Sequence, residues 1–301
     1  MGKLFYMRSL IIGMGIGALY KTVLTELGHE VVTVDTVKPA DFKSVGLAID
    51  AHKMFDATFI CTPNHTHEQI AYLISEHSRM VLIEKPGVRT ARDWEVMVKS
   101  CPETKFMMIK NNQYRDDIEL YRDIASKSTS IDIKWINYNR VPGPGTWFTN
   151  NHYSFGGVSR DLMPHLLSLV AAIKPDNYQD CNISNYVKEQ RWKLEHVLDT
   201  DYGVVNPDGL YDVDDYCRIR MVVDNLHFNL VADWRSMTQN DQSISFFYGF
   251  ERRFGLGLCP ESAYKKMIET AYANIDNDAW WKNQLEQDLW IHNMIGPYDE
   301  K

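Results

Sequence analysis

The chain has 301 residues, of which 45% are hydrophobic and 24% are charged, and this ordinary globular composition excludes a fibrous or low-complexity protein. Its length exceeds the roughly 150 residues that one compact core usually serves, so we expect two domains. The formal net charge is −8, and no local basic patch offsets it. Neither a nucleic acid nor an anionic membrane surface is therefore an expected partner.

Five cysteines are spread along the chain without a C-x-x-C pair. This pattern favours neither a disulfide framework nor a zinc site, so we expect a protein of the reducing cytoplasm with no bound metal. No apolar stretch approaches the roughly 20 residues that a membrane-spanning helix requires. We therefore expect a soluble protein that acts on a small molecule.

Residues 9–115 alternate short apolar runs with amphipathic stretches, which is the rhythm of β-α-β units wound into a parallel sheet. Thr66 and Thr90 each precede a helical pattern and are suited to cap it. The expected elements, in chain order, are a strand at 9–12, a helix at 18–27, strands at 31–34 and 57–61, a helix at 67–76, a strand at 80–83, a helix at 91–99 and a strand at 106–109.

The rhythm changes after Asp116, where longer strand-like runs predict a mainly antiparallel sheet. Within this half lies 140–157, a long stretch rich in Gly, Pro, Asn and aromatic residues, and loops of that length are usually functional. The expected elements are a helix at 118–125, a strand at 131–138, a helix at 162–173, strands at 216–223, 226–234 and 243–250, and two tail helices within 261–295 that separate near 274–278.

The first strand runs into Gly13-Met14-Gly15-Ile16-Gly17-Ala18, which fits the dinucleotide-binding pattern G-x-G-x-x-A immediately before a helix. Gly13 can make the tight turn, and Gly15 lets the backbone of Gly15 and Ile16 approach a pyrophosphate. Small Ala18 lets the helix pack close to the strand while the helix amides face the anion. The sequence therefore predicts a dinucleotide site at this turn.

The residues after the second strand bear on the choice of cofactor. Asp35 ends that strand about 22 residues after the first glycine, where a carboxylate can accept both ribose hydroxyls, and this geometry favours NAD. Thr36 and Lys38 could together hold the 2′-phosphate of NADP if Asp35 turned away. NADP therefore stays an alternative.

Three further motifs complete the pattern. The third strand leads into 61–67, which reads C-T-P-N-H-T-H, and the fourth ends in 84–86, which reads E-K-P. Both lie at carboxyl ends of parallel strands, where open α/β sheets place ligands. Much later, 156–165 reads G-G-V-S-R-D-L-M-P-H. In it Asp161 and His165 stand four apart, and they share one face if the segment is helical.

Together these residues resemble the Gfo/Idh/MocA oxidoreductases, the family of glucose-fructose oxidoreductase and inositol dehydrogenase. The glycine turn, the T-P-N-x-x-H stretch, the E-K-P tripeptide and a D-x-x-x-H after a glycine pair occur in the family's order and approximate spacing. Val158 and Met163 stand where many members have glycine, and Met163 would narrow the pocket. Pro164 is easiest to accommodate in the first turn of a helix, so Asp161 is expected at the very start of that helix.

The resemblance and the patterns above together predict an α/β fold of two domains. Residues 1–117 form a dinucleotide-binding Rossmann domain with a doubly wound parallel sheet. Residues 118–301 form an α+β substrate-binding domain with a large, mainly antiparallel open sheet. The resemblance alone implies that this sheet also mediates oligomer contacts in a homodimer or homotetramer. The C-terminal helices can pack back on the first domain.

The resemblance implies hydride transfer between a nicotinamide and a hydroxyl-bearing carbon of a sugar, sugar derivative or cyclitol. Loss of a hydride from an alcohol carbon must be accompanied by loss of the hydroxyl proton, so a base is required. His165 is the candidate base, with Asp161 orienting its ring. Lys85 would bind the same oxygen and stabilise a developing alkoxide. The sequence leaves open whether Lys85 or His165 makes the primary proton transfer.

Around the cofactor, the loops after the third and fourth strands supply further candidates. Pro63 and Asn64 are expected to shape the loop under the cofactor, and His67 lies near the nicotinamide ribose or simply begins the next helix. The expected cofactor contacts of these loops are Thr62, Pro63, Asn64, His67 and Glu84.

For substrate contacts we expect side chains that suit a polyol, with aromatic faces on C–H surfaces and Asn, His and Arg on hydroxyls. Arg140 and Arg160 could instead receive a phosphate or carboxylate of the substrate. The expected substrate contacts are Tyr114, Arg115, Arg140, Trp147, Asn151 and Arg160.

The sequence thus predicts an NAD(P)-dependent dehydrogenase or reductase of a sugar, sugar derivative or cyclitol. Two alternatives stay open. One is a non-catalytic dinucleotide-sensing regulatory or binding protein of the same fold. The other is a reductase of a tetrapyrrole or an imine, which the retained E-K-P tripeptide disfavours.

Overall fold

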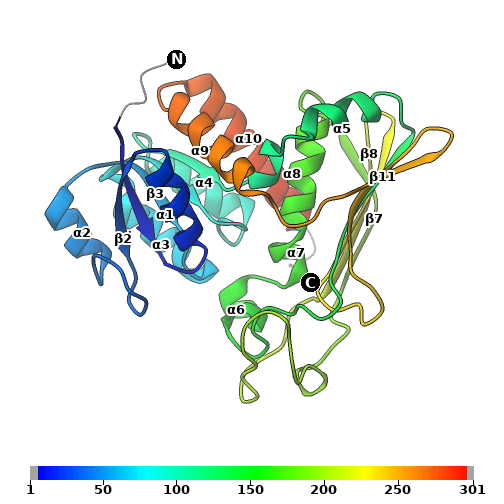
Figure 1. Ribbon diagram of the computed structural model, residues 1–301, viewed down its shortest axis with the longest axis horizontal. Coiled ribbons are helices and arrows are strands. Elements are labelled where there is room, and N and C mark those ends of the chain that lie inside the picture. Colours follow the sequence, from blue (N-terminus) through cyan, green and yellow to red (C-terminus); the bar gives the residue numbers. More distant parts are fainter. Residues whose placement is uncertain (1–5, 297–301) are drawn as a thin grey trace. The chain divides into compact units, whose positions relative to one another are not determined.

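The computed structural model describes residues 6–296 (Figure 1). These residues form two compact units, one made of 6–109 with 264–296 and the other of 110–263. The last two helices of the chain therefore pack mainly with the nucleotide-binding half of the sequence. The domain boundary at 117/118 stays a prediction, because a compact unit is not by itself an independently folding domain.

The first unit contains a five-stranded parallel sheet with the strand order β2-β1-β3-β4-β5. The predicted parallel Rossmann sheet is therefore confirmed, and its five strands lie within two residues of their expected bounds. The elements of this unit are β1 Arg8–Ile12, α1 Gly17–Glu26, β2 Glu30–Val34, α2 Val45–His52, β3 Phe55–Ile60, η1 Asn64–Thr66, α3 His67–Ser75, β4 Ser78–Ile83, α4 Ala91–Ser100, β5 Lys105–Met108, α9 Glu261–Ala273 and α10 Asp278–Ile295.

Two threonines expected to cap helices behave differently. Thr90 forms a capping box with Asp93, in which each side chain binds the other residue's backbone N–H. Thr66 makes no side-chain cap, because its hydroxyl is held in the preceding loop, 2.7 Å from Thr62 Oγ1 and 2.7 Å from the carbonyl oxygen of Pro63. The prediction for Thr66 was therefore wrong. Helix α2 was not predicted, although Ser44 caps it by accepting from the backbone N–H of Leu47.

The C-terminal helices are the two predicted from the tail. Asp288 of α10 is buried, and its Oδ2 accepts the backbone N–H of Met108 at the end of β5, 3.0 Å away. Trp281 and Trp290 are buried, and Trp280 packs edge-on against Trp281 with ring centroids 4.8 Å apart. The hydrogen bond between Asp288 and Met108 therefore joins α10 to β5, the edge strand of the parallel sheet.

The second unit contains a six-stranded sheet with the order β11-β10-β6-β9-β8-β7. Neighbouring strands are antiparallel except β6 and β9, so the predicted mainly antiparallel sheet is confirmed. The elements of this unit are η2 Asn111–Tyr114, α5 Ile118–Ala125, β6 Ser130–Ile136, η3 Trp147–Thr149, α6 Asn151–Ser154, α7 Val158–Asp161, α8 Met163–Ile173, β7 Cys181–Glu189, η4 Leu194–His196, β8 Tyr216–Val223, β9 Leu226–Asp233, β10 Asp241–Phe247 and β11 Glu251–Gly255.

The two edge strands of this sheet were not predicted. Strand β7 reads CNISNYVKE and β11 reads ERRFG, and neither contains the apolar alternation that identified the other strands. Each residue of both strands is exposed or only partly buried. Strands at an edge need no buried face, which removes the pattern on which sequence reasoning depends.

One face of the sheet packs on α5 and α8 (Figure 1). Ile131, Ile133 and Trp135 alternate along β6 and are buried on this side, as expected for a half-covered strand. The residues between them, Asp132 and Lys134, point to the opposite face. That face therefore carries charged side chains rather than an apolar surface.

Candidate active site

The glycine turn after β1 has the geometry that a dinucleotide site requires. Gly13 has φ +94°, and a Cβ there would lie 2.6 Å from the carbonyl oxygen of Cys61. A Cβ on Gly17 would lie 2.7 Å from the side chain of Ile11. Glycine is therefore needed at both positions to let the turn pass close to β3 and α1 pack on β1.

Gly15 differs from its two neighbours. An added Cβ would meet no described heavy atom within 4 Å, so the space beside it is open. The fold itself does not require glycine there, whereas a close approach of pyrophosphate does. The adjacent Ile16 is 41% exposed. The open space at Gly15 thus supports a dinucleotide site independently of the sequence motif.

Asp35 follows β2 beside this turn. Its Oδ2 accepts the backbone N–H of Met14 at 2.7 Å, and its Oδ1 accepts those of Val37 and Lys38 at 2.8 and 2.7 Å. Burial raises the pKa of Asp35, but the three backbone N–H groups outweigh it and lower the pKa below its usual value. The carboxylate is therefore ionised and fixed in orientation, as a partner of ribose hydroxyls should be.

Lys38 is one of the two residues that could favour NADP. Its Nζ donates to the carbonyl oxygen of Met14 at 3.3 Å, which places the ammonium at the glycine turn. The carboxylate of Asp35 nevertheless stays at the end of β2 through the contact with the Met14 amide. An ionised carboxylate there repels a 2′-phosphate, so this arrangement suits NAD better than NADP.

The order β1-β3-β4 places the glycine turn, the T-P-N loop and the E-K-P loop next to one another. Backbone hydrogen bonds continue the pairing past the strand ends, from Cys61 N to Ile12 O at 2.8 Å and from Glu84 N to Ile60 O at 2.9 Å. Lys85 follows directly and is partly exposed. The three motifs of the first unit therefore lie along one edge of its sheet.

His67 joins the second and third of these loops. It is fully buried, with Nδ1 2.7 Å from the carbonyl oxygen of Gly87 and Nε2 2.8 Å from that of Thr62. Burial is the largest influence on its pKa and lowers it to about 4, against the two carbonyls, which raise it. We assign His67 as a positioning residue for both loops. A direct cofactor contact by its ring stays a prediction.

The side chain of Glu84 is held by a hydrogen bond from helix α1. Tyr20 is buried in α1, and its hydroxyl donates to Glu84 Oε1 at 2.6 Å. Burial first and the Glu84 carboxylate second raise the pKa of Tyr20 well above its usual value, so the phenol stays protonated and remains a donor. Thr62, Pro63 and Asn64 lie in the neighbouring loop, where Pro63 precedes η1. Their cofactor contacts stay predictions, as does that of Glu84.

In the second unit, a close backbone approach shapes the segment that carries Asp161 and His165. A Cβ on Gly157 would lie 1.7 Å from the carbonyl oxygen of Asp214. The Asp214 carboxylate accepts the backbone N–H of Gly157 at 2.9 Å and that of Ser159 at 2.7 Å, at the start of α7. The glycine is therefore needed for the contact that anchors α7 to the segment before β8.

Asp161 and His165 do not share one helix. Asp161 ends the single turn of α7, and His165 is the third residue of α8, with Leu162 between the two helices. The prediction that Asp161 begins the helix of His165 was therefore wrong, while Pro164 does lie in the first turn of α8. Asp161 instead accepts the indole N–H of the buried Trp234, 2.8 Å from its Oδ2.

His165 is oriented by two residues that the sequence did not single out. Its ring stacks on that of Trp135, with centroids 5.9 Å apart and an interplanar angle of 28°. Its Nδ1 lies 3.2 Å from Nδ2 of Asn112 in η2. The polar run after the fifth strand could have indicated Asn112, because ligand residues gather at such strand ends. No sequence signal indicated Trp135.

The expected substrate residues are spread over several parts of the second unit. Arg115 and Arg160 are buried, at 7% and 2% exposure, whereas Tyr114 is partly exposed. Arg140 stacks on Tyr202 with its guanidinium carbon 4.4 Å from the ring centre. Their substrate contacts stay predictions.

Trp147 and Asn151 lie on the long loop at 140–157, which contains η3 and α6. The ring of Trp147 stacks on that of Phe148 with centroids 3.8 Å apart. The backbone N–H of Asn151 donates to Asp212 Oδ1 at 2.7 Å, and the loop makes further hydrogen bonds with 200–212. The two loops are therefore held together, which leaves Trp147 and Asn151 as candidates on an ordered surface.

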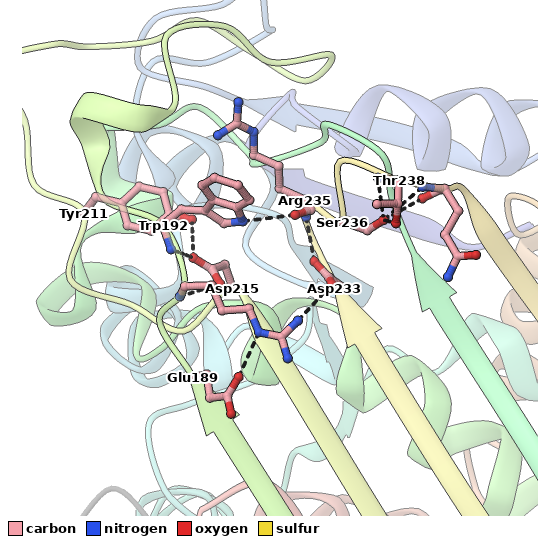
Figure 2. Close-up of polar contacts among 10 residues, drawn as sticks. Glu189, Trp192, Tyr211, Asp215, Asp233, Arg235, Ser236 and Thr238 are labelled. Carbon is pink, nitrogen blue, oxygen red and sulfur yellow. Dashed lines mark hydrogen bonds and ion pairs between the residues drawn. The ribbon is translucent and has the colours of Figure 1, made fainter.

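Asp215 fixes the connection between β7 and β8 (Figure 2). Its carboxylate accepts the backbone N–H groups of Arg191 and Trp192, both at 2.9 Å, and the hydroxyl of Tyr211 at 3.1 Å. Burial is the largest influence on the pKa of Asp215 and raises it to about 6. A cavity of about 820 Å³ lies beside this connection and is lined by Gln190, Lys193, Leu194, Glu195, Val197, Leu198, Val205, Pro207 and Tyr211.

Three further features bear on the sequence predictions. All five cysteines are free. Within residues 6–296, three or more His, Cys, Asp or Glu side chains never come together in a way that could hold a metal ion. In the same part of the chain, each helix is too short or too polar to cross a membrane.

The chain is similar in sequence to one protein family and to one curated protein. Residues 22–111 match the family described as oxidoreductases with an NAD-binding Rossmann fold, GFO_IDH_MocA. A putative UDP-kanosamine synthase oxidoreductase subunit of Amycolatopsis mediterranei (strain S699) is 25% identical over 199 residues, which cover 63% of this chain. The matched segment spans 54% of that relative's length, about half of it.

Solved structures share the fold over nearly the whole chain. GenD2 from gentamicin A biosynthesis, crystallised with NAD, has a TM-score of 0.73 at 16% identity and covers 96% of this chain and 92% of its own. A putative myo-inositol dehydrogenase from Sinorhizobium meliloti 1021 has a TM-score of 0.73 at 15% identity, with coverages of 96% and 95%. The family resemblance of the motifs is thus confirmed for residues 22–111, which match the Gfo/Idh/MocA oxidoreductase family.

Proposed function

We propose that the protein is an NAD-dependent oxidoreductase that transfers a hydride to or from a hydroxyl-bearing carbon of a sugar, sugar derivative or cyclitol. The observation that carries this proposal is the glycine turn with open space at Gly15 beside the fixed carboxylate of Asp35. Residues 22–111, which include Asp35 and follow the glycine turn, match an NAD-binding oxidoreductase family. Several proteins of the same fold are named as inositol or sugar dehydrogenases, which supports a polyol substrate.

The residues present fit the cofactor, and we propose which of them would bind it. Gly13, Gly15 and Ile16 would lie along the pyrophosphate, and Asp35 would accept the ribose hydroxyls. When bound, the nicotinamide supplies the hydride acceptor in oxidation or the hydride donor in reduction. Lys85 lies at the same edge of the sheet as the glycine turn.

Lys85, Asp161 and His165 form the proposed catalytic group. Loss of a hydride makes the carbinol oxygen acidic, so a group in contact with that oxygen has to take its proton. Lys85 and His165 both have nitrogen atoms suited to bind the oxygen. Asp161 is anchored by Trp234 and ends α7, and one residue separates it from the helix that carries His165.

The test is an activity screen with the full chain. The protein is incubated with NAD and a panel of sugars, sugar phosphates and inositols while the absorbance of reduced nicotinamide is followed. We expect a rise with at least one polyol and a much weaker one with NADP. Tight NAD binding without turnover of any polyol, or of the corresponding ketones with NADH, would contradict the enzyme and favour a dinucleotide-sensing regulator.

We also propose a homodimer or homotetramer that works in the reducing cytoplasm. The free cysteines are consistent with a reducing compartment. The face of the sheet opposite α5 and α8 carries Asp132, Lys134, Arg218 and Arg220, so a subunit contact through it would be polar rather than hydrophobic. Light scattering on the eluate of a sizing column measures the oligomeric state, and a rise in monomer with added salt is expected.

A further inference from the structure

Two cavities adjoin at Gln190, where β7 continues into the connection to β8. The first has a volume of about 820 Å³ and lies among 190–211. The second has a volume of about 410 Å³ and is lined by Tyr186, Lys188, Gln190, Asp212, Val213 and Asp214. Every residue of both cavities belongs to the second compact unit.

We propose that the two cavities together bind a glycosyl unit joined to the ring that is oxidised, so that the substrate is a disaccharide or a longer glycoside. This substrate class rests on the function proposed above. Each cavity falls within the range of about 300–1,000 Å³ that small-molecule sites usually have. Because the two share Gln190, a ligand of two joined units can extend from one into the other.

The lining of the first cavity is largely apolar. Val197 is fully buried and Tyr211 is 8% exposed. The hydroxyl of Tyr211 donates to Asp215 (Figure 2), so the ring rather than the hydroxyl is left for a ligand. Lys193 and Glu195 contribute one charge of each sign, so the lining has no net charge. A neutral molecule with apolar C–H faces, such as a sugar ring, therefore suits this cavity better than a phosphate or a carboxylate.

The side-chain amide of Gln190 has a defined orientation. Its Nε2 donates to the carbonyl oxygen of Trp192 at 3.1 Å and to that of Tyr211 at 2.8 Å. Because a carbonyl oxygen can only accept, the amide nitrogen has to face these two groups. Oε1 is therefore the atom that Gln190 can offer to a ligand. An acceptor at the residue that both cavities share suits a sugar hydroxyl.

The wall of the first cavity is held in place without a ligand. Asp215 fixes the backbone of Arg191 and Trp192 and the hydroxyl of Tyr211. The indole N–H of Trp192 donates to the carbonyl oxygen of Arg235 at 3.0 Å. A wall that is already ordered loses little conformational entropy on binding, which favours affinity.

The second cavity is more polar than the first and touches the proposed catalytic segment. Asp214 lines it, and the carboxylate of the same residue accepts backbone N–H groups at the start of α7, the helix that Asp161 ends. Asp212 also lines it and accepts the backbone N–H of Asn151, an expected substrate contact. A ligand that fills both cavities would therefore reach the residues that anchor α7 and the long loop at 140–157.

Methyl NMR of the full chain with labelled valine tests binding without turnover. The probes are cellobiose, maltose, lactose and trehalose, with glucose at the same concentration for comparison. We expect at least one disaccharide to shift the signals of Val197 and Val205, and glucose to shift them much less. Val23, buried in α1, should be unaffected. No shift of Val197 or Val205 with any of the four disaccharides would overturn the proposal.

Two neighbouring valines provide a variant and its matched control. Val205 lines the first cavity, so Val205→Trp should obstruct it and weaken disaccharide binding about tenfold or more. Val204 is 80% exposed and is not part of the lining, so Val204→Trp should leave the affinity unchanged. Equal weakening by both substitutions, or by neither, would contradict the site. If Val205→Trp does not fold, the wild-type shifts decide.

Kinetics test whether the bound disaccharide is the substrate. We expect kcat/KM for the disaccharide to exceed that for its monosaccharide about tenfold or more. Val205→Trp should lower this ratio about tenfold, and Val204→Trp should not change it. A disaccharide that shifts Val197 but is not turned over, while a monosaccharide is, would overturn the proposal. If the wild type turns over no polyol at all, the proposed function fails, and the NMR result still decides whether the cavities bind a glycoside.

Discussion

The two halves of the candidate site are built in different ways. In the first unit, the glycine turn, the T-P-N loop and the E-K-P loop follow neighbouring strands of one parallel sheet, and each motif is a contiguous run of sequence. Around His165, the partners come from separate segments, and the arginine that orients Asn112 is tied to Leu256, 141 residues later. The first half is therefore defined by local motifs, and the second by tertiary packing.

This difference has consequences for mutation. A substitution in the first half that leaves the backbone unchanged should alter binding or chemistry without altering stability. A substitution in the second half should act through the partners that hold His165. The expected outcomes below compare the two, beginning with the largest effect.

Lys85→Ala removes one member of the proposed catalytic group from the partly exposed loop after β4. We expect turnover to fall about a thousandfold or more, because both proton transfer and electrostatic stabilisation are lost. NAD affinity, measured by calorimetry, should change little, since the glycine turn and Asp35 are untouched. Near-normal turnover in this variant would refute the assignment of Lys85.

Gly157→Ala and Gly15→Ala compare the two halves directly. A Cβ at Gly157 would lie 1.7 Å from the carbonyl oxygen of Asp214, so we expect a loss of about 3 kcal/mol in the free energy of unfolding. A Cβ at Gly15 meets no described atom within 4 Å, so stability should stay within about 0.5 kcal/mol while NAD affinity falls. Urea unfolding and NAD titration measure both, and equal destabilisation by the two substitutions would contradict the comparison.

The burial of His67 between two loops should make the stability of the protein depend on pH. Its pKa of about 4 in the folded chain lies below the value of about 6.5 expected when unfolded, so between these values the unfolded chain binds more protons. The free energy of unfolding should therefore be unaffected by His67 above pH 6.5. It should fall by on the order of 3 kcal/mol as the pH drops from 6.5 toward 4. An NMR titration of the His67 ring with a midpoint near 6.5 would contradict this.

Asp35→Ser tests cofactor choice in the first half. The variant loses the carboxylate that we propose accepts the ribose hydroxyls. Hydrogen bonds to a charged group are worth about 1.5–3 kcal/mol, so we expect the preference for NAD over NADP to fall about tenfold to a hundredfold. The ratio of kcat/KM values for the two cofactors measures it. An unchanged ratio would remove Asp35 from the site.

The sequence predicted the first half of the site more completely than the second. The glycine turn and Asp35 were identified because a βαβ unit ties each residue to a known place on a sheet edge. Asp161 and His165 were also identified, but they were predicted to lie in one helix. The break at Leu162 was missed because it depends on the anchoring of α7 by Asp214. That contact joins segments more than fifty residues apart and leaves no periodic trace in the sequence.

The partners of His165 and Asp161 were missed for the same reason. Trp135 belongs to β6 and Trp234 directly follows β9, and the apolar pattern correctly predicted both strands. The pattern indicates that such residues are buried, but it does not indicate what their rings contact. The edge strands β7 and β11 were not predicted, because strands without a buried face lack the alternation of apolar and polar residues.

The most direct test of the central claim is a crystal structure of the complex with NAD and a polyol that the activity screen identifies. The account predicts one reacting carbon next to the nicotinamide, with Lys85 Nζ and His165 Nε2 both within hydrogen-bond distance of its oxygen. A complex in which these two nitrogen atoms contact different groups of the ligand, or in which either of them faces a separate crevice, would contradict it.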